Sequence, residues 1–111
     1  MIEIDNDKNI TVSRYDTFSI RFKLKNYLLT DNDKFVFAIK ATTNSTEVVY
    51  EASFYNAGQN YIDVVVPKGA LDNLEPGAYI YDTAIINNVT NQIITCFFTK
   101  AFIIKGVAHN V

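Results

Sequence analysis

Alternation of apolar and polar residues is the feature that most constrains how this chain folds. In the run from Phe18 to Lys25, every second residue is apolar and the residues between them are polar. A strand sends successive side chains to opposite faces, so this pattern predicts a strand with one buried and one solvated face. Further segments rich in Val, Ile, Tyr and Phe predict strands at residues 10–12, 35–39, 47–54, 61–66, 79–86 and 93–104.

Turn signals separate these segments at close intervals, in runs rich in Asn, Asp, Thr and Gly. About seven short strands without a convincing amphipathic helix predict an all-β fold, an Ig-like antiparallel β-sandwich. Residues 67–77 are the least regular, and we expect one helical turn at 70–74 where the chain crosses between sheets. No repeat or linker is present, so we expect a single domain over residues 1–111.

Composition and charge limit the classes of function. Hydrophobic residues make up 49% of the 111 residues and charged residues 20%, which excludes a disordered chain. Lys+Arg 10 against Asp+Glu 12 leaves no surplus of cations to neutralise phosphates, so no nucleic-acid partner is expected. The acidic N-terminus does not resemble a signal peptide, and no apolar run approaches the ~18 residues of a membrane span. We therefore expect a chain made in the cytoplasm and not inserted into a membrane.

Catalytic groups are scarce in this sequence. The single histidine, His109, lies in the C-terminal tail, and Cys96 lies in an apolar run that predicts a small buried hydrophobe. Asp31, Asn32 and Asp33 lack the spacing of a calcium-binding loop and are interpreted as a solvated turn. No glycine-rich phosphate loop is present. We therefore predict no catalytic residue, no metal site and no cofactor, which leaves a small hydrolase as the weakest alternative.

A structural site is predicted at the end of the irregular segment. Pro76 and Gly77 form a turn, and Tyr79 follows just inside the next strand. In Ig-like sandwiches, a tyrosine at this place often returns its hydroxyl to the upstream backbone and forms a tyrosine corner. The alternative is a half-buried tyrosine that only fills space.

Several strands are apolar on both faces, notably residues 64–66, 93–98 and 101–104. Nothing inside a two-sheet sandwich covers the outer face of either sheet. A bulge, a loop or a neighbouring subunit must therefore cover the extra apolar side chains. One hypothesis is a self-association interface on the strand 93–104. The alternative is a bulge near Thr99 and Lys100 that swaps the faces and buries both halves. The candidate interface residues are Ile94, Cys96, Phe97, Phe98, Phe102 and Ile104.

Tyrosines near turns suggest a second class of function. The chain has seven tyrosines and no tryptophan, and sugar-binding sandwiches stack pyranose rings on such aromatic residues. Tyr27, Tyr50, Tyr55 and Tyr61 flank predicted turns and are candidates for a glycan platform. The alternative is a set of rim residues, each with one packed face and a solvated hydroxyl.

The order of segments resembles a known family. A short strand at residues 1–5 is followed by Arg-Tyr-Asp-Thr-Phe at 14–18, Asp-Lys-Phe-Val-Phe at 33–37, Gly-Ala-Tyr-Ile-Tyr-Asp at 77–82 and Phe-Ile-Ile at 102–104. This order is similar to the small Ig-like β-sandwich domains of tailed-phage and prophage tail and baseplate proteins, including the N-terminal domain of the baseplate upper protein. The approach to the last strand, Cys-Phe-Phe-Thr-Lys-Ala at 96–101, is less polar than in that family and suggests a different interface.

The resemblance implies a non-enzymatic structural role in assembly. It implies further copies of the chain or other phage tail proteins as partners. The expected location is then the cytoplasm during synthesis and a virion or tail-like particle afterwards. Members of the family often continue into helical or receptor-facing modules, which leaves open whether this domain belongs to a longer chain.

Overall fold

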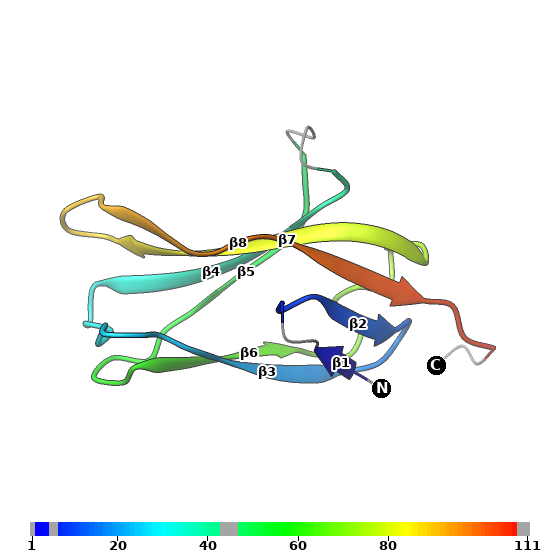
Figure 1. Ribbon diagram of the computed structural model, residues 1–111, viewed down its shortest axis with the longest axis horizontal. Coiled ribbons are helices and arrows are strands. Elements are labelled where there is room, and N and C mark those ends of the chain that lie inside the picture. Colours follow the sequence, from blue (N-terminus) through cyan, green and yellow to red (C-terminus); the bar gives the residue numbers. More distant parts are fainter. Residues whose placement is uncertain (1, 5–6, 43–46, 109–111) are drawn as a thin grey trace.

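Two layers of strands of unequal size build the fold (Figure 1). The computed structural model describes residues 2–4, 7–42 and 47–108, and their side chains except at 2–4 and 97–99. Within these ranges the strands are β1 (Ile2–Ile4), β2 (Ile10–Ser13), β3 (Phe18–Lys23), β4 (Asp33–Lys40), β5 (Val48–Phe54), β6 (Tyr61–Val66), β7 (Gly77–Asn87) and β8 (Ile93–Lys105).

The strands are divided unequally between the two sheets. The large sheet has the order β1-β2-β8-β7-β4-β5, and β3 pairs with β6 in the small sheet. The all-β prediction is confirmed, and each strand predicted from alternation is present; the short β1 brings the number in the described residues to eight. The expectation of purely antiparallel pairing is wrong for β2 and β8, which are parallel. Parallel neighbours need a long connection, and these two lie at opposite ends of the sequence.

An aromatic cluster holds the two sheets together. From the small sheet, the ring of Phe22 lies 5.8 Å from Phe35 and 6.3 Å from Tyr81, measured between ring centroids. Phe18, on the same strand, lies 6.1 Å from Phe102 of the large sheet. Alternation explains this packing, because Phe18, Ile20 and Phe22 are buried while Ser19, Arg21 and Lys23 are exposed.

Loops help the small sheet to cover the core, because its two strands are too few to cover the whole inner face of the six-stranded sheet. Leu24, Leu29 and Leu74 lie outside the strands and are buried in the same core. The backbone amide of Leu24 donates to the carbonyl of Asn60 at 2.7 Å, which continues the β3–β6 pairing by one residue.

The crossing from β6 to β7 is formed by turns and not by the expected helical turn. The amide of Ala70 donates to the carbonyl of Pro67 at 3.2 Å, and that of Leu74 to Leu71 at 3.0 Å. Gly69 has a φ of +89°, which is outside the helical region and interrupts any helix at this point. The segment nevertheless crosses between the two sheets as predicted.

Candidate functional site

The interface hypothesis for β8 is wrong for two of its residues. Phe102 is 0% exposed and Ile104 is 3% exposed, and both belong to the core. The ring of Phe102 contacts those of Phe37 and Tyr81. The small sheet covers this side of β8, where the ring of Phe18 of β3 lies 6.1 Å from that of Phe102, so Phe102 and Ile104 cannot contact a partner.

The other candidates on β8 have a different position. Ile94 and Cys96 are half-buried and pack against the edge of the core. Together with Leu24 and Tyr27 they line a hollow of about 390 Å³ beside the small sheet. Phe97 and Phe98 were predicted interface residues whose side chains lie outside the described part of the structure.

The predicted bulge in β8 is accompanied by a second one. From Tyr81 to Ala84, β7 advances by three residues, whereas their partners Lys100 and Thr95 are five residues apart. Strand β8 therefore holds two extra residues. One extra residue exchanges the faces of a strand and a second one restores them. Inward residues are consequently even-numbered on both sides of the irregular segment, as Cys96 and Phe102 show.

The outer face of the large sheet carries aliphatic side chains interspersed with charged ones, among them Lys34, Lys40 and Asp82. Ile80 of β7 is flanked by Ala101 and Lys40, and Ile103 of β8 by Ala78 and Thr11. At the far end of the sheet, Ile93 is 66% exposed. We call this surface the outer face, and define it by the partly exposed residues Val36, Ala38, Ile80, Ala84, Ile86, Ala101 and Ile103.

Sequence reasoning recognised this surface only in part. Val36 and Ala38 make the second face of their strand less polar, which the sequence already indicates. Ile80 and Ile86 were not singled out as candidates, although they alternate with the inward residues of β7. A count of apolar residues on each face, strand by strand, would have found them.

The outer face of the small sheet is polar by contrast. The guanidinium of Arg21 donates to both carboxylate oxygens of Asp63, at 2.8 and 3.1 Å, and lies over the ring of Tyr61 at 4.0 Å. The hydrogen bonds from Arg21 lower the pKa of Asp63 below its ordinary value. This face therefore resembles an ordinary solvated surface.

The four candidate glycan tyrosines do not form one platform. Tyr27 donates to Asp33, and Tyr50 packs against the core at 6.5 Å from Phe37. Only Tyr55 and Tyr61 come together, where they line a shallow hollow of about 270 Å³ beside the β5–β6 turn. Tyr55 is 61% exposed, so its ring is accessible.

Asp33 is a buried structural carboxylate, and its interpretation as part of a solvated turn is wrong. The residue is 1% exposed. One of its oxygens accepts hydrogen bonds from the Tyr27 hydroxyl at 2.7 Å and from the amide and hydroxyl of Thr30 at 2.9 and 3.1 Å. The other oxygen accepts a hydrogen bond from the side-chain amide of Asn87 at 3.0 Å. The carboxylate thus joins the start of β4 to the end of β7.

Of the remaining candidates for chemistry, Cys96 lies within the described residues. Burial raises the pKa of the Cys96 thiol, which favours the protonated and poorly nucleophilic form. Its sulfur lies 3.7 Å from the carbonyl of Ile94. His109 lies outside the described residues.

The predicted corner residue makes the expected contact. The hydroxyl of Tyr79 donates to the carbonyl of Glu75 at 2.7 Å, across the exposed turn at Pro76 and Gly77. This is the hydrogen bond that the tyrosine-corner interpretation predicts. It ties the start of β7 to the segment that crosses between the sheets.

Replacing Tyr79 with phenylalanine tests how much this bond stabilises the fold. The ring packing is kept and one hydrogen bond is lost, so we expect the free energy of unfolding to fall by about 1 kcal/mol in urea denaturation. Tyr55→Phe is the matched control, because Tyr55 is 61% exposed. Equal effects of the two substitutions would show that the corner bond contributes nothing specific.

Comparisons with known proteins bear on the fold. No protein-family model and no curated protein matches the chain. Among solved structures, a putative glycoside hydrolase from Bacteroides vulgatus is similar, with a TM-score of 0.51 over 88% of this chain and 13% sequence identity. This chain spans 16% of the length of that protein. Within the described residues, no helix is long and apolar enough to cross a membrane.

Proposed function

We propose that this protein is a non-enzymatic structural module that acts through protein–protein contacts in the tail or baseplate of a phage or prophage. The observation that carries the protein-contact role is the aliphatic outer face of the large sheet. Apolar side chains gathered on a partly exposed sheet face are typical of interaction sites. The phage setting rests on the resemblance in segment order. Further copies of the chain or other tail proteins are the proposed partners.

The Ig-like assignment is part of this proposal. Two features support it: the tyrosine at the start of the strand that follows the crossing between sheets, and the division of the strands into two facing sheets. Domains of this architecture host many unrelated functions, so the role must be argued from the surface.

Charge introduced on the outer face tests the assembly role. We expect Ile80→Lys and Ile103→Lys to leave the protein folded and to weaken its association at least about tenfold, because an ammonium group would have to be buried in the contact. The readout is molar mass by light scattering over a range of concentrations. Val65→Lys is the matched control, since Val65 is 51% exposed on the outer face of the small sheet. Variants that keep the wild-type mass at every concentration would exclude this face as the interface.

The second candidate function is binding of a cell-surface glycan. It is supported by the exposed ring of Tyr55 beside Tyr61 and by the polar side chains of Asn56 and Asp63 in the same hollow. The similar Bacteroides protein is described as a glycoside hydrolase, but the likeness extends to the fold alone. Saturable sugar binding that is lost in Tyr55→Ala, by a protein that stays monomeric, would favour this candidate over assembly.

A further inference from the structure

Strand β3 presents a free hydrogen-bonding edge. In an antiparallel pair, residues alternate between those that exchange hydrogen bonds with the partner strand and those that do not. The Leu24–Asn60 bond continues the β3–β6 register, so the even-numbered residues of β3 bond to β6. The peptide groups of Ser19, Arg21 and Lys23 therefore point away from β6. No other strand of the described chain pairs with them, and we call these three residues the β3 edge.

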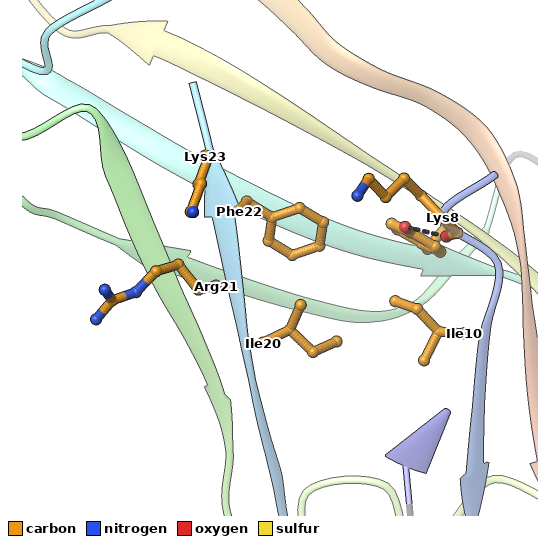
Figure 2. Close-up of a pocket in the computed structure, with 7 residues that line it drawn as sticks. Lys8, Ile10, Ile20, Arg21, Phe22 and Lys23 are labelled. Atoms are coloured by element: carbon orange, nitrogen blue, oxygen red, sulfur yellow. Dashed lines mark hydrogen bonds between the residues drawn. The ribbon is translucent and has the colours of Figure 1, made fainter. Parts of the chain in front are cut away.

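Two hollows lie along this edge, between the small sheet and the inner face of the large sheet. The first has a volume of about 340 Å³, and Figure 2 shows Ile20 and Phe22 of β3 facing Ile10 across it, while Arg21 points away. The second has a volume of about 390 Å³. Lys23 lines both. An extended segment added to the β3 edge would send alternate side chains toward these two hollows.

The rim of these hollows is positively charged, although the net charge of the whole chain is −2. Lys8, Arg21, Lys23 and Lys25 line them, and no Asp or Glu is among their described lining residues. Arg21 is paired with Asp63. The three lysines have no ion pair within the described part of the chain.

These charges decide which strand the edge accepts. Lysines on an edge strand disfavour an apolar strand, and like charges disfavour the pairing of two β3 strands with each other. An extended segment that alternates apolar with acidic residues would place apolar side chains in the hollows and acidic side chains beside the lysines. Residues 2–5 of this chain, Ile-Glu-Ile-Asp, alternate in this way, and Asn6 and Asp7 extend the segment to the length of the six-residue β3.

We propose that the β3 edge binds residues 2–7 of a second copy of the chain by strand addition, and that two copies exchange these segments reciprocally. The inference rests on the proposed assembly role and names one partner and contact for it. Within one copy, β1 pairs with β2 through only three residue pairs. Exchange replaces this short pairing with a longer one on β3 and neutralises the three lysines.

Proline substitution tests the backbone contact. Ser19→Pro removes an amide that points to the free edge and leaves the bonds between β3 and β6 intact. We expect it to raise the dissociation constant of the dimer at least about tenfold in light scattering. Val65→Pro is the matched control, because Val65 is the cross-strand partner of Ser19 and its amide points to the opposite edge of the same sheet. Equal dimerisation of both variants and the wild type would overturn the inference.

A charge exchange tests the identity of the occupant. Lys23→Glu/Lys25→Glu gives a chain with an acidic edge and an acidic segment, and Glu3→Lys/Asp5→Lys gives a chain with a basic edge and a basic segment. We expect each double variant to be monomeric alone and the two to form a dimer when mixed, since both contacts in the mixed dimer are complementary. A mixture that stays monomeric overturns the inference, because segments that pair within their own chain would not respond to mixing.

The outcomes also separate this inference from the assembly role. If every edge variant assembles like the wild type while Ile80→Lys does not, the strand exchange is wrong and the outer face remains the interface. If Ile80→Lys assembles normally while Ser19→Pro does not, the outer face is wrong and the strand exchange is supported. A wild-type protein that is monomeric at every concentration overturns the strand exchange.

Discussion

Replacing Phe102 with alanine is expected to lower the free energy of unfolding by about 4 kcal/mol. The side chain is 0% exposed and its ring contacts those of Phe18, Phe37 and Tyr81, which come from both sheets. Alanine would leave a cavity where the two sheets meet, and the surrounding rings can fill it only in part. Urea denaturation of the variant and the wild type measures the difference.

Ile103→Ala is the matched control for this substitution. Ile103 is the next residue of β8 and lies on the outer face, where truncation is expected to cost less than about 1 kcal/mol. The pair compares a core residue with an outer-face residue of the same strand. A Phe102→Ala variant of nearly wild-type stability but altered molar mass would contradict the buried position of Phe102 and restore its role as an interface residue.

Asp33→Ala is the second substitution with a large expected effect, about 3 kcal/mol of lost stability. Four hydrogen bonds from Tyr27, Thr30 and Asn87 end on this carboxylate. Removing it leaves these donors without their acceptor at a site that is 1% exposed. Asp33→Asn is the informative control, because it keeps the size of the side chain but lacks the charge and one acceptor oxygen. Equal stability of wild type and Asp33→Ala would show that water replaces the network without loss.

The Asp33 network also predicts how stability depends on pH. Burial alone would raise the pKa of Asp33, but the hydrogen bonds from Thr30, Tyr27 and Asn87 outweigh it and hold the pKa below the ordinary 3.8. The carboxylate therefore stabilises the fold fully above its unfolded pKa, and this contribution is lost as pH falls through the lower folded pKa. Acid unfolding followed by circular dichroism should show this loss in the wild type and not in Asp33→Ala.

The same contact acts on Tyr27 at high pH. The hydrogen bond to Asp33, with burial, raises the pKa of the Tyr27 hydroxyl from 10.0 to about 12. The unfolded chain loses this proton first, so stability is expected to fall as pH rises from 10 to 12. Tyr27→Phe should remove this part of the alkaline dependence.

Local patterns were sufficient to predict the strands. Alternation in β3 assigns Phe18, Ile20 and Phe22 to the core and Arg21 to solvent, because strand geometry alone sends successive side chains to opposite faces. The corner at Pro76 and Tyr79 was also predictable, since its hydrogen bond joins residues only four positions apart. Features that depend on neighbours in the sequence are readable from the sequence.

Contacts between distant segments were decided only by the tertiary structure. Asp33 was interpreted as a solvated residue because a turn pattern does not show burial: its bonds to Tyr27 and Thr30 are local, but its bond to Asn87 joins a residue 54 positions away. Phe102 was assigned to an interface because its strand is apolar on both faces, so alternation could not tell the core face of β8 from its outer face; the position of the small sheet decides it. The division of the strands into a sheet of six and a sheet of two is a third example, because alternation identifies a strand but does not specify which sheet the strand joins. The amino-acid sequence therefore determined which segments form strands, whereas long-range pairing decided which apolar residues became core, outer face and the open edge of β3.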